Sequence, residues 1–118
     1  MLNLSMQPPM TPNEYQEAAL RTAIYPDRGS NFIYPALGIC GESGEVAEKV
    51  KKIIRDKGGA LTDTDRKNIA LEASDICWYL AVLAYELGFT LEEVMQMNLD
   101  KLASRKERGV LSGSGDAR

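Results

Sequence analysis

Histidine is missing from all 118 residues of the sequence. Imidazole is the most frequent transition-metal ligand and the usual general base near neutral pH, so its absence argues against a zinc enzyme with histidine ligands. It also argues against the di-iron carboxylate bundles, which need Glu-x-x-His on two helices. Any general base that this chain uses must therefore be a group other than imidazole.

Cysteine is scarce, and the two that occur, Cys40 and Cys77, form no CxxC pair. We interpret both as small apolar side chains in a reducing compartment, which argues against a disulfide framework and a zinc site. The first ten residues lack the basic start and the long apolar run of a secretory signal. These features together predict a cytoplasmic protein.

Long apolar runs and an excess of positive charge are missing as well. The longest apolar stretch, "ICWYLAVLAY" at residues 76–85, is too short to cross a bilayer. The net charge of −3 provides no general attraction for nucleic acid or for an anionic membrane. We therefore expect one domain over residues 1–118 whose partners include neither a membrane nor nucleic acid.

Helix start signals occur where a threonine precedes an acidic residue by three positions, in "TPNE", "TDTD" and "TLEE". Glycine or proline marks the ends, and no alternating apolar pattern argues for strands. The predicted fold class is all-α, a four-helix bundle-like arrangement with helices at about 12–24, 35–57, 63–87 and 91–108. Residues 1–10 form a short N-terminal segment, and the glycine- and serine-rich residues 110–118 are expected to be a flexible tail.

The third predicted helix is apolar on nearly all sides from Ile76 to Ala84. More than one face of this helix must therefore be covered, and a single copy with four helices can bury only part of that surface. We expect a homo-oligomer, either a dimer or a tetramer, with Trp78 at a subunit contact.

Acidic pairs recur in the same position on the second and third predicted helices. Glu42 and Glu45 lie at the edge of an apolar stripe, and Glu72 and Asp75 lie at the matching edge thirty residues later. If both stripes face one core, four carboxylates line one seam and repel each other unless a cation neutralises them. An all-oxygen ligand set suits Mg²⁺, or Mn²⁺, and bound magnesium is often completed by substrate phosphates.

An ordinary alternative applies to each acidic pair taken alone. Lys49 follows Glu45, and Lys52 follows Glu48, by the four residues that are typical of solvated ion pairs on a helix. One such pair would be interpreted as helix surface. The coincidence of two pairs on consecutive helices is what favours a metal site.

The stretch "GESGEVAEKVKK" followed by "LEASDICWYLA" resembles the MazG-type nucleotide pyrophosphohydrolases of the all-α NTP pyrophosphatase superfamily. Residues 42–45 and 72–75 match the two acidic motifs of that family, and "NLDKLASRKERGVLSGSGDAR" resembles the closing part of small stand-alone and phage-encoded members. The resemblance implies Mg²⁺-dependent hydrolysis of a nucleoside or deoxynucleoside triphosphate to the monophosphate and pyrophosphate, as in nucleotide-pool clean-up. It makes Glu42, Glu45, Glu72 and Asp75 the metal ligands.

The resemblance and the positions on the predicted helices together indicate candidate catalytic and substrate-binding residues. Glu42, Glu45 and Glu48 are the candidates for catalysis, with Glu48 as the carboxylate that orients or deprotonates water. Relatives often carry an acid where this chain has Gly41 or Leu71, which leaves open how many metals bind and which residue is the base. The candidate substrate-binding residues are Lys49, Lys52, Trp78, Tyr79, Asn98, Lys101 and Arg105.

Two functions from other classes stay compatible with the sequence. One is a catalytically inactive helical module for protein interaction, which the glycine at position 41 allows and which predicts no stabilisation by metal. The other is a nucleotide sensor that binds Mg²⁺ and a nucleoside triphosphate without releasing pyrophosphate.

Overall fold

The computed structural model describes residues 10–118, and this part of the chain contains four helices and no strand. The helices are α1 (Pro12–Leu20), α2 (Ile33–Lys57), α3 (Asp63–Glu86) and α4 (Leu91–Glu107). The all-α fold class is confirmed. Most of the predicted N-terminal segment 1–10 lies outside the described residues. None of the described helices is both long enough and apolar enough to cross a membrane.

All three predicted threonine caps are present as complete capping boxes. The hydroxyl oxygen of Thr62 accepts a hydrogen bond from the N–H of Asp65 (3.1 Å), and the Asp65 carboxylate accepts one from the N–H of Thr62 (3.0 Å). The same reciprocal pair occurs at the start of α1 and of α4. Each box satisfies two backbone donors that a helix start leaves unpaired, which is why these starts could be read from the sequence.

Two helix boundaries differ from the expectation. The first helix ends at Leu20 and not near Ile24, since the chain turns so that Ala23 and Tyr25 enter the core. The second helix begins at Ile33, two residues early, where the side chain of Asn31 accepts a hydrogen bond from the N–H of Tyr34 (3.1 Å). Asn31 therefore acts as a helix cap, because its side chain satisfies a backbone N–H in the first turn of α2.

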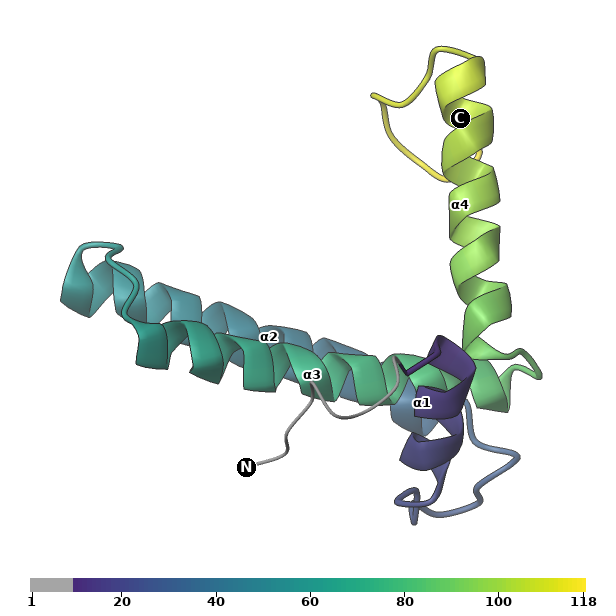
Figure 1. Ribbon diagram of the computed structural model, residues 1–118, viewed down its shortest axis with the longest axis horizontal. Coiled ribbons are helices and arrows are strands. Elements are labelled where there is room, and N and C mark those ends of the chain that lie inside the picture. The colour runs from purple at the N-terminus through teal and green to yellow at the C-terminus, as the bar shows by residue number, and fades with distance from the viewer. Residues whose placement is uncertain (1–9) are drawn as a thin grey trace.

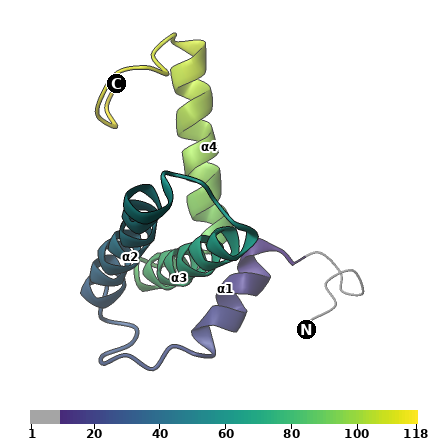
Figure 2. The same cartoon turned by 90° about the vertical axis from the view of Figure 1, so that its left-hand side faces the viewer.

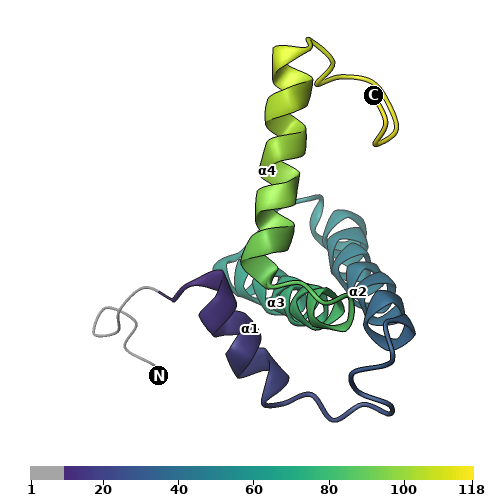
Figure 3. The ribbon, with the colours of Figure 1, turned by 90° about the vertical axis from the view of Figure 1, so that its right-hand side faces the viewer.

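The helices α2 and α3 form a long antiparallel hairpin, and α1 crosses one end of α3 (Figure 1). The last helix, α4, contacts α1 and α3 and then projects away from the hairpin, as Figures 2 and 3 show from two sides. The radius of gyration is 17.2 Å, against about 13–14 Å for a compact domain of this length. One copy of the chain is therefore an open arrangement of helices.

The direction of α4 is set by a buried glutamine. The Gln16 amide donates hydrogen bonds to the carbonyls of Ala81 (3.0 Å) and Phe89 (3.2 Å) and accepts one from the N–H of Leu91 (3.0 Å). Buried amides that lack partners are costly, so this full set holds α1 against the turn between α3 and α4. Asn13 adds a hydrogen bond from α1 to the first turn of α4.

The hydrophobic core is small and lies where α1 meets α3. Ala23, Tyr25 and Val82 are buried there, with Leu20 and Trp78 packed against them. The carboxylate of Glu86 accepts hydrogen bonds from the Tyr25 hydroxyl and from two N–H groups of the loop that leads into α2. These bonds fix that loop on α3, and with it the start of α2.

A glycine allows the two long helices to come close together. The ring of Tyr79 in α3 lies against Gly38 in α2, so that a methyl group on Gly38 would overlap the ring. Gly44, two turns further along α2, faces open space. Because Tyr79 follows Asp75 by one turn and Gly38 precedes Glu42 by one turn, this contact sets the spacing of the acidic residues.

Substituting these two glycines tests the contact. We expect Gly38→Ala to lower the free energy of unfolding by about 1–2 kcal/mol, because overpacking exceeds the gain in helix propensity. Gly44→Ala, the matched control, should raise it by up to about 1 kcal/mol. Urea unfolding followed by circular dichroism measures both. Equal stabilisation by the two substitutions would contradict the close contact.

Candidate metal centre

Three carboxylates converge in the seam between α2 and α3. Glu42 comes from α2, and Glu72 and Asp75 come from α3; one oxygen of each lies within 4.8 Å of the others. The hairpin turns two sequence motifs thirty residues apart into one site, with Glu42 and Glu72 half-buried and Asp75 exposed. Three of the four predicted metal ligands are thus brought together.

The fourth predicted ligand, Glu45, lies beside this cluster and not within it. Its side chain is exposed on the next turn of α2, yet its charge still reaches Glu42. Loss of hydration and the negative charges of Asp75, Glu72 and Glu45 raise the pKa of Glu42 above its ordinary value. Such mutual repulsion is what a bound cation would relieve, so the donor set fits a hard divalent ion.

One lysine partly neutralises the cluster. The ammonium of Lys49 lies 3.6 Å from Glu72 across the hairpin and so does not form the predicted pair within its own helix with Glu45. Lys52 pairs with Glu48 (3.6 Å), and Lys51 does so more closely (2.9 Å). The predicted pair Glu48–Lys52 is therefore present, and it keeps Glu48 out of the carboxylate cluster.

The charge state of Glu48 follows from these lysines. The hydrogen bond from Lys51 and the positive charges of Lys51 and Lys52 hold the pKa of Glu48 below its ordinary value. A carboxylate with a lowered pKa is a weaker base, and the carboxylate of Glu48 is paired with two exposed lysines, Lys51 and Lys52. The structure of one copy thus places Glu48 in the ordinary helix ion pair that the sequence also allowed.

Aromatic side chains form one wall beside the acids. A shallow pocket of about 370 Å³ is lined by Thr22, Glu42, Asp75, Trp78 and Tyr79. The indole N–H of Trp78 donates to the hydroxyl of Thr22 (2.8 Å), and the Trp78 and Tyr79 rings meet edge to face with centroids 5.0 Å apart. Two predicted substrate-binding residues therefore lie at the acidic cluster.

Thr22 was not among the predicted site residues; it falls in a segment predicted to continue the first helix, whereas α1 ends at Leu20. Trp78 has two kinds of neighbour within its own chain. It packs on the core of its own chain and lines the pocket, so the predicted subunit contact of this residue remains a prediction.

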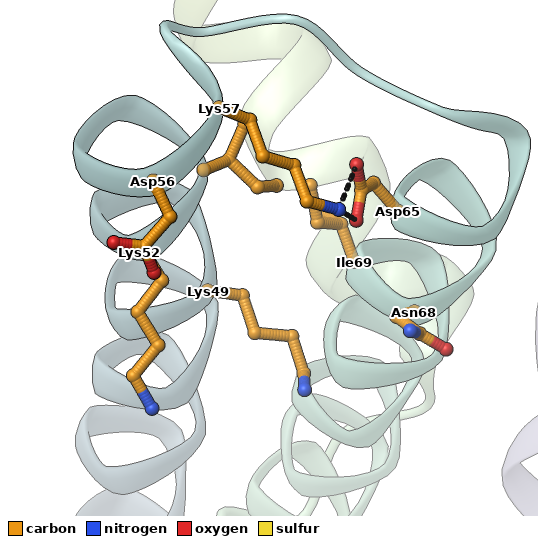
Figure 4. A pocket seen from close by; sticks show the side chains of 8 residues that line it. Lys49, Lys52, Asp56, Lys57, Asp65, Asn68 and Ile69 are labelled. Carbon is orange, nitrogen blue, oxygen red and sulfur yellow. Dashed lines mark hydrogen bonds and ion pairs between the residues drawn. The ribbon is translucent and has the colours of Figure 1, made fainter.

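A second pocket, rich in lysine, lies further along the same seam (Figure 4). It has a volume of about 160 Å³, and Lys49, Lys52 and Lys57 contribute to its lining. Lys57 is held by Asp65 (2.8 Å), and this hydrogen bond together with the N–H of Thr62 lowers the pKa of Asp65 to about 2. Lys49 lines this pocket and also pairs with Glu72, so it connects the lysines with the carboxylates.

The predicted substrate-binding residues of α4 are not at this site within one copy. Among the described residues α4 has no contact with α2, which carries Glu42. Asn98 is exposed, and Lys101 and Arg105 form ion pairs with Asp116 of the C-terminal tail.

Comparison with known proteins identifies a family that this chain matches. Residues 35–110 match the family model of the MazG nucleotide pyrophosphohydrolase domain. The chain belongs to the MazG family. The matched region contains the whole of the acidic cluster, most of α2 and all of α3 and α4, so the resemblance seen in the sequence motifs is confirmed.

A phage protein is similar over nearly its whole length. The chain is 50% identical over 109 residues to the Gene 37 protein of Mycobacterium phage L5, covering 88% of this chain and 96% of that protein. This likeness agrees with the expected small, phage-like type of MazG protein. No solved structure matches the chain. MazG proteins are generally metal-dependent, which agrees with the oxygen-only cluster of Glu42, Glu72 and Asp75.

Thermal unfolding with and without metal tests the centre. A ligand at about 100 times its Kd stabilises a folded protein by about 2.7 kcal/mol, so saturating Mn²⁺ should raise the melting temperature by several degrees. Asp75→Asn should lose most of that rise.

Lys49→Met provides a sharper version of the same test. Without its ammonium the carboxylates repel more strongly, so we expect a lower melting temperature without metal and a larger rise with Mn²⁺ than in the unaltered chain. Lys52→Met, which removes a charge that pairs outside the cluster, is the matched control and should respond as the unaltered chain does. An equal Mn²⁺ response in Asp75→Asn would rule out this cluster as the metal site.

Proposed function

We propose that the protein is a Mg²⁺-dependent pyrophosphohydrolase that converts a nucleoside or deoxynucleoside triphosphate to the monophosphate and pyrophosphate. The observation that carries this proposal is the convergence of Glu42, Glu72 and Asp75 beside an aromatic pocket in a MazG chain. Mn²⁺ would fit the same oxygen ligands. A role in removing unwanted nucleotides follows from such an activity.

The residues at the site suggest how the substrate would lie. Trp78 and Tyr79 offer ring faces and edges to a nucleobase next to the acids. Lys49 and Lys52 line the seam on the other side of Glu72 and would neutralise the outer phosphates. If the nucleotide lies along the seam, with its base in the aromatic pocket and its outer phosphates at the lysines, its α-phosphate would lie next to the carboxylate cluster.

In the proposed reaction a water oxygen bonds to the α-phosphorus while the bond from that phosphorus to the bridging oxygen breaks, and pyrophosphate leaves. A bound divalent ion would neutralise charge on the phosphate oxygens and lower the pKa of coordinated water. Glu42, Glu72 and Asp75 would hold that ion, with Glu45 completing the set. The proton of the attacking water would pass to a carboxylate, since the chain has no histidine.

Lys49 would change partner during substrate binding. Its ammonium now balances Glu72 at 3.6 Å. Once a cation occupies the cluster, Lys49 is free to turn along the seam toward a phosphate. This exchange lets one lysine stabilise the acids in the free protein and the substrate in the complex.

The alternative of a catalytically inactive nucleotide sensor or interaction module has one observation in its favour. Position 41 is glycine, although a side chain built there would meet nothing within 4 Å. The missing acid is therefore not imposed by packing. It leaves a site with fewer ligands, which could bind nucleotide and metal without turnover.

Pyrophosphate release from a panel of nucleoside and deoxynucleoside triphosphates separates these functions. We expect release with Mg²⁺ or Mn²⁺ and none with a chelator. Asp75→Asn should reduce the rate by roughly 100-fold or more, because loss of even an outer-shell partner of a metal ligand costs 10- to 100-fold. Asp63→Asn, an exposed acid in the first turn of the same helix, is the control. Stabilisation by Mg²⁺ and nucleotide without release would favour the sensor.

We also infer that the working protein is a homodimer or homotetramer. One copy leaves an apolar row uncovered on the projecting helix α4, where Met95, Leu99 and Leu102 are 48%, 58% and 39% exposed. These positions follow the i, i+4, i+7 spacing of one helix face. A second row on α2 includes Val50 and Ile54, which are 40% and 64% exposed. Such rows on a small open fold favour self-association.

Mass measurement by light scattering tests this inference. We expect a mass of two or four chains, and we expect Leu99→Gln together with Leu102→Gln to shift it toward one chain, because the buried apolar area is lost. Ser104→Gln on the same helix should leave the mass unchanged. A monomer at micromolar concentration in the unaltered protein would contradict the assembly.

A further inference from the structure

The C-terminal tail, residues 108–118, closes on itself at the end of α4 (Figure 1). The guanidinium of Arg118 donates hydrogen bonds to the carbonyls of Val110 (3.1 Å), Leu111 (3.1 Å) and Gly115 (2.6 Å). Arg108, just after α4, donates to the carbonyl of Arg118 (2.7 Å). The tail is thus a closed loop with its own hydrogen bonds.

This loop presents one carboxylate to two cations of α4. A single oxygen of Asp116 lies 3.1 Å from the ammonium of Lys101 and 3.0 Å from the guanidinium of Arg105. The same guanidinium nitrogen donates to the backbone carbonyl of Asp116 (3.1 Å). The hydrogen bonds from Arg105 and Lys101 hold the pKa of Asp116 below its ordinary value. Asp116 therefore stays ionised as the counterion of both residues.

Arg105 has binding capacity that Asp116 does not use. It is only 5% exposed, although it lies near the end of a helix that projects away from the rest of the protein. Its Nε is buried and has no hydrogen-bond partner among residues 10–118. A buried cationic donor without a partner is costly, and a guanidinium is built to bind a planar or tetrahedral anion through two nitrogens. Both oxygens of Asp116 that Arg105 binds are reached by one terminal nitrogen, so a phosphate that also reached Nε would satisfy more of this side chain.

The contact is also easy to open. The side chain of Asp116 is 82% exposed and that of its partner Lys101 is 40% exposed, and ion pairs between exposed side chains stabilise little. Gly113 and Gly115 precede Asp116 in the tail and have positive φ angles of 124° and 81°, backbone states that glycine leaves and enters at low cost. A polyphosphate carries several charges against the single one of Asp116.

We propose that the tail is an internal competitor, in which Asp116 occupies the Lys101–Arg105 pair and must leave before a phosphate-bearing ligand binds there. The proposal rests on the proposed function for the identity of the ligand, a nucleoside triphosphate, and it makes the tail a brake on substrate binding. The anion site itself can be tested without metal or turnover.

Tripolyphosphate binding to the full chain, measured by calorimetry in the presence of a chelator, is the test. If the tail is closed in about 70–90% of molecules, removing the competing charge tightens apparent binding by about 3- to 10-fold. We expect this gain for Asp116→Asn. Asp100→Asn is the matched control, since it removes the same charge from an exposed acid of α4 that accepts a hydrogen bond from Gln96 (2.8 Å). The control should change affinity less than twofold.

Two further measurements keep the test decisive. Lys101→Met should weaken binding without exposing the buried guanidinium of Arg105. In the unaltered protein the amide resonances of Gly113 and Gly115 should shift as tripolyphosphate saturates, because the tail moves.

Equal gains in Asp116→Asn and Asp100→Asn would reduce the effect to net charge and overturn the proposal. Absence of tripolyphosphate binding in every variant, or unmoved glycine resonances at saturation, would overturn it as well. Since no metal is present, these outcomes do not depend on whether the chain releases pyrophosphate. Conversely, loss of the proposed activity would leave the metal-free binding result standing.

Discussion

The close approach of α2 and α3 at one glycine is the constraint on which the candidate site depends. The Tyr79 ring fills the space that a side chain on Gly38 would take, so the two backbones come close one turn away from Glu42 and Asp75. Three carboxylates then share a volume in which their oxygens lie within 4.8 Å of one another. A larger residue at position 38 would separate the helices and, with them, the ligands of any bound cation.

Bringing like charges together has a cost that this chain offsets in two ways. Lys49 reaches across the hairpin to Glu72, which reduces the net charge of the cluster in the free protein. The second way would be a bound cation, since the family is generally metal-dependent and the oxygen-only ligand set suits a hard ion. The lysine-lined pocket farther along the seam extends this balance of charge, because it places positive side chains where the outer phosphates of a nucleotide would lie.

The second main feature of the fold is the direction of α4, which projects away from the hairpin. Gln16 and the α3–α4 turn direct α4 away from the hairpin, so the cations near its end meet the chain's own tail and not the acids. The exposed apolar row of α4 is compatible with the self-association proposed above. Lys101 and Arg105 of the same helix are paired within one copy by Asp116 of the tail. Within one copy, the acids of the hairpin and the cations near the end of α4 therefore lie apart.

The amino-acid sequence alone determined the helix starts, the all-α class and the register of the acids. Thr11, Thr62 and Thr90 begin helices through bonds to residues three positions away, and Glu42, Glu72 and Asp75 hold fixed places on a helix turn; both are local relations that spacing reveals. The tertiary structure decided the partners. Lys49 pairs with Glu72 and not Glu45, Glu45 lies beside the cluster, Thr22 joins the pocket, and Asp116 covers Lys101 and Arg105. The pairing of Lys49, the place of Glu45 and the position of Thr22 depend on the distance and angle between whole helices, to which the Gly38–Tyr79 contact and the Gln16 hydrogen bonds contribute. The contact of Asp116 depends instead on how the C-terminal tail folds back on α4. None of these leaves a periodic trace in the sequence.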